Sequence, residues 1–441
     1  MFTTFISSLQ TEGLRHKILV TISAVILYRF GTSIPSPGIN YHNIQRCIEQ
    51  VNSGNSAQIY SLINFFSGGA LLQLTVFSMG AMPYITSSIV IQLLTVIIPR
   101  FEQLKKEGQS GQTKMIQYAR YLSIVLAVLQ STSIVVLAAN GGLLQGCSFT
   151  VIEGSSIFSL FVIILVMTAG AALVMWLGEL ITERGIGNGI SILVFAGITA
   201  RFPSEVSSIF KGYSRLMFLS TCLVIAFIII IVVFVEQGQR RILIQYAKPI
   251  SNNRTLNEVY TYLPLKINQS GVIPVIFASS LIYIPHLIIQ IIQKQNSNLD
   301  IGLFGRFITF YLTNPTNKIY IIVYFSLIIF FTYFYVSIVF NTEEYADEMK
   351  KCGGFIPGVR PGKSTASYLS SILNKITLPG SLYLGMIAIL PNLLFQVTDS
   401  EQLQNIPFSG TAVLIMIGVG LDTVKQIESQ LIQRNYEGFL K

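Results

Sequence analysis

Long uninterrupted runs of apolar residues dominate the chain. A helix needs about 20 apolar residues to cross the hydrocarbon core of a bilayer. Eight runs approach or exceed that length: 18–34, 76–98, 118–139, 157–181, 216–235, 272–292, 319–340 and 368–394. Two weaker segments, 185–200 and 409–431, are glycine-rich or polar toward one end. The pattern predicts an all-α membrane protein of ten transmembrane helices, if both weaker segments also span.

The distribution of basic residues favours including the weak segment 185–200. Without it, the basic loops 236–266 and 341–367 would face the opposite side of the membrane from the basic loop 100–114. With it, all three lie on the cytosolic side, as the positive-inside rule expects. We therefore expect ten spans with both termini on the cytosolic side, which would be the stromal side in a plastid.

One apolar segment, 59–75, is too short and too rich in glycine to span. It directly precedes a full span, which is typical of a short re-entrant helix surrounded by protein or by a water-filled cavity. Pro83, Pro274 and Pro285 lie within predicted spans, where each removes a backbone hydrogen bond and can kink the helix. These features indicate bent helices around a cavity.

Composition excludes a soluble protein and offers no cysteine framework. Hydrophobic residues make up 51% and charged residues 11% of the chain, whereas soluble domains are about a quarter charged. The cysteines form no CxxC pair and suit neither a disulfide framework nor a metal site, so we interpret them as inert. Because Cys47 and Cys147 lie on the same predicted side, one bridge between them stays open as an alternative.

Catalytic chemistry is not indicated. The chain has three histidines and neither HExxH nor GxSxG. The string GVRPGKST at 358–365 is one residue too short for a phosphate loop, so neither ATP binding nor another cofactor is expected. Glu179, Glu183 and Glu236 fall at cytosolic span ends, and ionisable residues are otherwise scarce within spans. That scarcity argues against a small-solute or ion-coupled transporter, which is kept as the alternative function.

Eight strings in a fixed order carry a family resemblance. They are FSGGAL at 66–71, MPYI at 82–85, QLLTV at 92–96, KKEGQSGQ at 105–112, WLGELITERGIGNGIS at 176–191, VEQGQRRILIQYAK at 235–248, LPLKINQSGVIPVIFASS at 263–280 and GFIPGVRPGKST at 354–365. Together they resemble the SecY/Sec61-alpha family of protein-conducting channels over nearly the whole chain. The resemblance implies a single membrane domain, 1–441, of two pseudo-symmetric halves arranged as a clamshell. The N-terminal half would be 1–201, with spans one to five and a plug near 62–74, and the C-terminal half 202–441.

The resemblance also assigns roles to individual residues. The pore ring would be Ile85, Ile190, Val194, Ile276 and Ile415. The plug would include Phe65, Phe66, Ser67, Gly68, Gly69, Ala70 and Leu71. Docking of a ribosome or of the SecA motor ATPase would use Arg240, Arg241, Lys248, Arg360 and Lys363. Ala81 departs from the pattern, because bacterial members often carry a larger aliphatic residue there, which would weaken one contributor to the ring.

In that family unfolded polypeptides cross the membrane through the ring, and hydrophobic segments leave sideways between spans two and three and spans seven and eight. The implied partners are signal peptides, nascent polypeptides, lipid, SecA, the ribosome through its RNA, a SecE-like subunit and a further small subunit such as SecG. Short termini and heavy use of Ile, Asn, Tyr and Phe resemble plastid-encoded members. We therefore expect a chloroplast thylakoid membrane, with a bacterial plasma membrane as the alternative.

Overall fold

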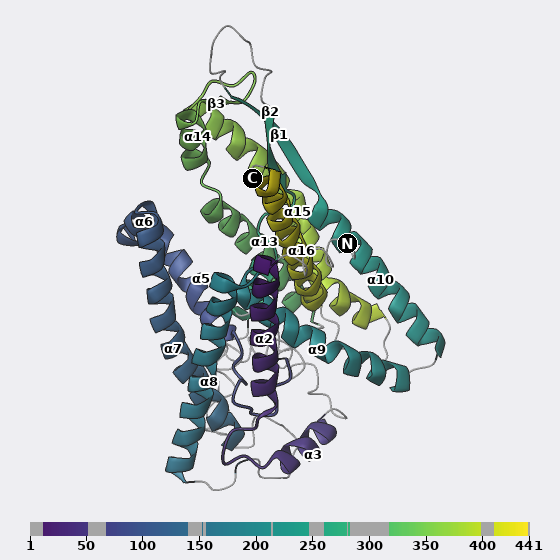
Figure 1. Cartoon of the computed structure of the whole chain (residues 1–441). Helices are drawn as coiled ribbons and strands as arrows, with labels where there is room; N and C mark the ends of the chain where they lie inside the picture. The colour runs from purple at the N-terminus through teal and green to yellow at the C-terminus, as the bar shows by residue number, and fades with distance from the viewer. Residues whose placement is uncertain are drawn as a thin grey trace.

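Helices fill most of the described structure, a computed structural model (Figure 1). It describes residues 12–51, 68–139, 152, 156–212, 215–246, 260–279, 281–282, 317–397 and 410–439. Helices lie at nine of the ten predicted spans: α2 (Glu12–Ser33), α5 (Met82–Ile97), α7 (Gln109–Ala139), α8 (Ile157–Arg184), α9 (Gly189–Gly212), α10 (Arg215–Gln237), α13 (Lys318–Val339), α15 (Lys363–Val397) and α16 (Gly410–Phe439). Of the remaining predicted span, 272–292, residues 273–279 are helical and most of the rest lies outside the described residues.

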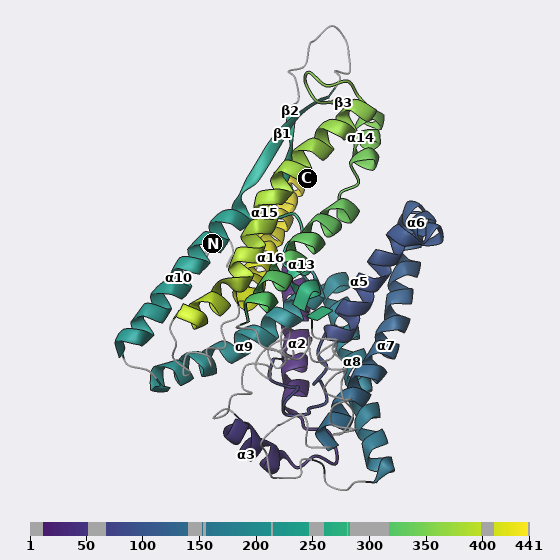
Figure 2. The ribbon, with the colours of Figure 1, turned by 180° about the vertical axis from the view of Figure 1, so that it is seen from behind.

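Length and hydropathy support a membrane location for this helical body. In the described part of the chain, four helices are long and apolar enough to cross a membrane: those beginning at Gln109, Ile157, Lys318 and Lys363. A fifth results if α5 and α6 (Pro99–Lys106), which bend by 101° at their junction, form one span. Figures 1 and 2 place α5 to α8 on one side of the molecule and α10, α15 and α16 on the other.

The second predicted span begins later than its apolar run suggests. Residues 76–81 form turns, Gly80 adopts a φ of 53°, and α5 begins only at Met82. Pro83 lies in the first turn of α5, where its missing N–H would have had no helical partner anyway. The prediction that Pro83 interrupts a span is therefore wrong. Pro274 likewise lies at the start of the helical residues 273–279, and Pro285 lies outside the described residues.

A small antiparallel sheet extends beyond the helices at one end of the molecule. Strand β1 (Gln239–Tyr246) pairs along its length with β2 (Tyr260–Lys266) and at its end with β3 (Gly354–Phe355), in the order β2-β1-β3. Ile242 and Ile244 of β1 are buried, and Ile242 packs with Ile356 and Leu369 over the beginning of α15. The sheet thus joins the two basic loops of the C-terminal half into one platform, next to α14 (Thr342–Lys351).

At the opposite end, α3 (Tyr41–Val51) packs its apolar side against the N-terminal half. Ile44 and Cys47 are fully buried in a cluster with Leu72, Met79 and residues of α7 and α8. Cys47 is disulfide-bonded, so the interpretation that every cysteine is inert is wrong for this residue. Cys147 lies outside the described residues.

Candidate functional site

An apolar cluster, which we call the waist, joins elements of the two predicted halves, 1–201 and 202–441. Its members come from α2, residues 76–81, α5, α8 and α9 of the predicted N-terminal half, and from residues 272–276 and α16 of the predicted C-terminal half. The buried members are Ala24, Tyr28, Phe77, Ala81, Val174, Leu177, Ile181, Ile192, Leu193, Val194, Ile198, Ile276, Ala412, Ile415 and Val419. Partly buried against them lie Val25, Val76, Ile85, Leu180, Ile190, Phe195 and Val272. The waist is the place where both halves share one core.

All five residues assigned to the pore ring belong to the waist. Val194, Ile276 and Ile415 are buried, and Ile85 and Ile190 are half-buried against them. They come from α5, α9, residues 273–279 and α16, segments far apart in the sequence. Ala81, the departure from the family pattern, lies in the same cluster. The structure therefore brings together every residue that the sequence assigned to this site.

The turn between α8 and α9 positions two of these side chains. Asn188 caps α9 by accepting hydrogen bonds through Oδ1 from the backbone N–H of Ile190 at 3.2 Å and of Ser191 at 3.4 Å. A Cβ at Gly189 would overlap the carbonyl oxygen of Gly178 in α8, so only glycine fits there. The GIGNG string is thus a tight turn that holds α9, and with it Ile190, against α8.

In the predicted plug segment, Gly68 and Gly69 lie against α9. Gly68 adopts a φ of 65°, and a Cβ there would be 2.9 Å from the Cα of Gly197. Gly197 in turn lies three residues after Val194 of the waist, and a Cβ on it would be 3.4 Å from the Tyr28 hydroxyl oxygen. Because neither Gly68 nor Gly197 has a side chain, the backbone at Gly68 can approach the waist closely. Phe65, Phe66 and Ser67 lie outside the described residues.

The last residues of the predicted plug segment, Ala70 and Leu71, and the chain that follows them are anchored on neighbouring elements. Ala70 and Leu71 are buried, and Leu71 packs in the cluster around α7 and α8. The carbonyl oxygen of Ala70 accepts the backbone N–H of Thr75 at 3.2 Å. The N–H of Ser36 donates to the carbonyl oxygen of Leu74 at 3.1 Å, which ties this segment to the chain leaving α2. The residues that directly follow Gly68 and Gly69 are therefore held in place by packing and by backbone hydrogen bonds.

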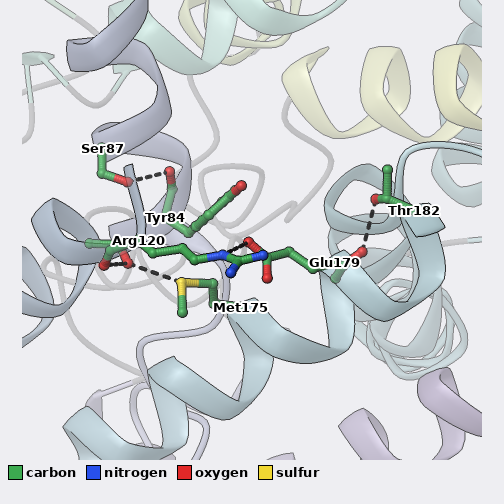
Figure 3. Close-up of polar contacts among 8 residues, drawn as sticks. Tyr84, Ser87, Arg120, Met175, Glu179 and Thr182 are labelled. Atoms are coloured by element: carbon green, nitrogen blue, oxygen red, sulfur yellow. Dashed lines mark hydrogen bonds and ion pairs between the residues drawn. The ribbon is translucent and has the colours of Figure 1, made fainter. Parts of the chain in front are cut away.

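An ion pair borders the waist on the side predicted to be cytosolic. Nε of Arg120 in α7 lies 2.7 Å from Oε1 of Glu179 in α8, and Tyr84 of α5 lies beside them (Figure 3). The Glu179 side chain is 15% exposed and that of Arg120 is 39% exposed. Glu179 immediately precedes the waist residues Leu180 and Ile181. The pair therefore connects α7, which corresponds to a span of the predicted lateral gate, to α8, which contributes residues to the waist.

The sequence interpretation missed this pair, because it noted Glu179 only as a charge at the cytosolic end of a predicted span. A signal was present in the predicted spans. Arg120 lies two residues inside the cytosolic end of span 118–139, and Glu179 lies two residues inside the cytosolic end of span 157–181. Antiparallel neighbours place such residues at the same depth, where opposite charges can pair.

Removing one partner should destabilise the helical body. We expect Arg120→Met to lower the free energy of unfolding by about 2 kcal/mol, because Glu179 would remain largely enclosed without its charged hydrogen-bond donor. The double variant Arg120→Met/Glu179→Met should recover most of this loss. Thermal unfolding of the purified protein provides the measurement.

Lys106→Met is a matched control for this substitution. Lys106 pairs with Glu102 at the same distance, 2.7 Å, but both of those side chains are more than half exposed. Loss of such a surface pair costs less than about 1 kcal/mol. If Arg120→Met and Lys106→Met lower the free energy of unfolding equally, the Arg120–Glu179 pair stabilises the protein no more than a surface pair does.

The predicted docking residues lie on the platform formed by the sheet. Arg240 and Arg241 are exposed on β1, and Arg360 and Lys363 are exposed beyond β3. Lys248 lies outside the described residues. Positive φ angles at Gly353, Gly358 and Gly362 make the connection from β3 to α15 a series of turns. The structure therefore brings both basic loops to one platform, because β1 pairs with β3.

Polar contacts attach the platform to the helices below. The Asn268 side chain donates to Oε1 of Glu236 at 2.6 Å, and Nζ of Lys266 lies 2.9 Å from Oδ1 of Asp422. They link the end of β2 and the segment after it to the C-terminal end of α10 and to the middle of α16. In the part of the chain that the structure describes, no group of three or more His, Cys, Asp or Glu residues could hold a metal ion.

Comparison with protein families and curated sequences gives one consistent match. A family model described as SecY matches residues 75–424. The protein translocase subunit SecY of Mycobacterium tuberculosis strain H37Rv is 64% identical over 441 residues, which is 100% of each chain. The subunit of the same name from Mycobacterium leprae is 63% identical over 441 residues, and that of Streptomyces coelicolor is 53% identical over 447 residues, again covering 100% of each chain.

Solved structures share the fold at much lower identity. The structure of a protein conducting channel superposes with a TM-score of 0.67 at 18% identity, covering 95% of this chain and 93% of that one. Sec61 in the canine ribosome-channel complex from the endoplasmic reticulum gives a TM-score of 0.63 at 18% identity, with the same coverage of each chain. These likenesses establish the architecture of the described helices.

Proposed function

The chain belongs to the SecY family, and on this premise we propose that it is the central pore-forming subunit of a protein-conducting channel. In this role it passes unfolded polypeptides across a membrane and releases hydrophobic segments sideways into lipid. In this proposal the chain supplies the passage and a partner supplies the driving energy.

The composition of the waist carries this proposal. Ile85, Ile190, Val194, Ile276 and Ile415 gather there from both halves, and none of them offers a hydrogen bond or a charge. An aliphatic constriction can lose its water and so block ions. The same side chains give a passing polypeptide no specific partner, so every sequence can pass. A site built for one small polar solute would instead need polar groups that converge on the solute.

We place ten spans around the waist in two halves, 1–201 and 202–441. Nine helices at predicted positions support this, and residues 273–279 are the start of the seventh span. We propose that in the resting state the plug, of which the structure describes residues 68–71, fills the outer side of the passage. The close approach of Gly68 to Gly197 supports this placement, because it brings the segment to the edge of the waist.

The lateral gate is proposed between α5 and α7 on one side and the seventh span with α13 on the other. A signal helix in the passage would leave there by transfer of its apolar side chains to lipid. Each central Leu, Ile, Phe or Val contributes about 0.3 to 0.6 kcal/mol on the insertion scale. About ten such residues would contribute several kcal/mol, which is enough to hold a gate open.

The sheet platform is the proposed docking surface for cytosolic partners. Arg240, Arg241, Arg360 and Lys363 are exposed there, and Lys248 belongs to the same basic loop. Guanidinium and ammonium groups would bind ribosomal RNA phosphates or acidic groups of a SecA motor ATPase. A SecE-like subunit, and a further small subunit such as SecG, would complete the complex in lipid.

Charge reversal on this platform should separate docking from assembly. We expect Arg360→Glu to reduce motor-driven translocation at least about tenfold, because one charge-assisted contact is lost and a repulsive one is introduced. Recovery of the purified complex should not change. Lys318→Glu, an equal charge change at the N-terminal end of α13, serves as the control and should transport normally. Normal transport by Arg360→Glu would reduce this loop to a determinant of membrane topology.

The similar proteins favour a bacterial plasma membrane over a thylakoid. Those reported above come from Mycobacterium and Streptomyces, which are bacteria. The plastid expectation rested on residue usage alone and gains no support from them. We therefore propose the bacterial plasma membrane, with both termini in the cytosol. Fractionation of a tagged copy in the source organism would test this placement.

Reconstitution tests the proposed function. The purified complex in vesicles, supplied with SecA, ATP and an unfolded protein that carries a signal peptide, should give protein protected from added protease. Protection should disappear when the signal peptide is removed. Constitutive saturable flux of a small solute, without any protected protein, would refute the proposal.

A further inference from the structure

One contact crosses from the cytosolic tip of the N-terminal half to the C-terminal half. Helix α6, which connects α5 to α7, packs mainly against these two helices. From α6, Nζ of Lys105 donates a hydrogen bond to the backbone carbonyl oxygen of Ile338 at 3.0 Å. Ile338 lies in the last turn of α13. The bond therefore joins helices on opposite sides of the proposed lateral gate.

The acceptor is well suited to a lysine. The last four carbonyl oxygens of a helix have no partner within it, and the helix dipole places partial negative charge there. Helix α13 ends at Val339, and its capping N–H, that of Phe340, donates to the carbonyl oxygen of Val336. The carbonyl of Ile338 is therefore left for an external donor, and the Lys105 ammonium supplies both the hydrogen bond and the positive charge.

The surrounding charges act in the same direction. Helix α14 follows α13 directly and begins with Glu343 and Glu344, while the Asn341 side chain caps it. On the other side, the Glu102 hydrogen bond raises the pKa of the Lys106 amine, and the charge of Glu344 adds to this shift. A basic tip thus faces an acidic first turn across the gap, on either side of the Lys105 bond.

We propose that Lys105 acts as a latch that holds the cytosolic end of the lateral gate closed in the resting channel. This inference rests on the proposed function, because it specifies how that gate is regulated. An exposed hydrogen bond to a charged donor changes the ratio of closed to open gate by only about fivefold. A signal helix or a docked partner can therefore release the latch without a separate energy source.

Replacement of the donor tests the latch. Lys105→Met keeps most of the length of the side chain and removes its charge and donors, whereas Lys105→Arg keeps both. Lys114→Met is the matched control, because Nζ of Lys114 pairs at 3.3 Å with Glu107 of the same tip. Among the described residues, this pair is its polar contact, and it does not cross the gate. The first readout is the lateral release into lipid of a marginally hydrophobic segment. Lys105→Met should raise the ratio of released to translocated segment about fivefold, and the other two variants should match the wild type.

A second readout needs no transported protein. Cysteines at exposed Gln103 in α6 and exposed Asp347 in α14, in a Cys222→Ser/Cys352→Ser background, are joined with a short bifunctional reagent. Lys105→Met should lower the cross-linked fraction of the resting complex severalfold, and Lys114→Met should leave it unchanged. If Lys105→Met equals Lys114→Met in this assay, the latch is refuted. Failure of the wild type to release or translocate any segment would refute the proposed function instead, while the cross-link still decides about the latch.

Discussion

A channel carrying Ile85→Gly and Ile276→Gly should conduct ions at rest at least about tenfold better than the wild type. Both side chains lie in the waist, Ile276 buried and Ile85 half-buried against the cluster. Glycine removes four carbons at each position and leaves room for water between the two halves. A wetted constriction no longer excludes ions. Electrical recording of the complex in a planar bilayer measures the change.

The control for this double variant must carry the same backbone change elsewhere. Ile230 lies on the exposed side of α10 and can be replaced by glycine within a helix just as Ile85 is. Glycine costs such helices about 1 kcal/mol, so a leak caused by general weakening would appear in Ile230→Gly as well. Equal resting conductance in Ile230→Gly and the double variant would remove the ring assignment.

The plug should be displaced by one added methyl group. In Gly68→Ala the new Cβ would lie 2.9 Å from the Cα of Gly197, and the residue would keep an unfavourable φ of 65°. The contact is between backbones, so neither side can move without shifting a segment. Left-handed backbone alone costs a residue with a side chain about 1 to 2 kcal/mol. We expect resting ion leak to rise about tenfold and defective signal peptides to be accepted more readily.

Gly108→Ala is the control that separates the backbone strain of a positive φ from the clash of the added Cβ with Gly197. Gly108 adopts a φ of 71°, close to that of Gly68, but a Cβ there would meet nothing within 4 Å. Its backbone cost is therefore similar, and it lies in the cytosolic turn after α6. Leak in Gly68→Ala without leak in Gly108→Ala identifies displacement of the plug. If neither variant leaks ions, the proposed contact of the plug with α9 is contradicted.

The positions of most helices could be predicted from the sequence because long apolar runs have few alternatives in a membrane. In the described part of the chain, helices lie at nine of the ten predicted positions, although several begin or end at other residues than the runs do. The start of α5 could not be predicted from hydropathy, because residues 76–81 are as apolar as the helix that follows them. The positive φ of Gly80 and the position of Pro83 in the first turn set where the helix begins. Local chemistry there overrides hydropathy.

Other features depended on segments meeting in space. Strand β1 lies in a loop recognised only as basic, and its partner β3 lies about a hundred residues further along the chain. The five pore-ring residues came from the family resemblance, since any single aliphatic residue in a span is more often ordinary packing. The bond from Lys105 to Ile338 could not be predicted at all, because its acceptor is a backbone atom available at the end of every helix.

Site-specific photocrosslinking tests the central claim most directly. A photoreactive residue at Ile276, with one at exposed Ile230 of α10 as control, is combined with a nascent chain stalled halfway through translocation. If polypeptides pass through the waist, the probe at Ile276 captures the stalled chain and the probe at Ile230 captures only lipid or other subunits. Absence of any adduct between Ile276 and the stalled chain, while translocation proceeds, would contradict the account.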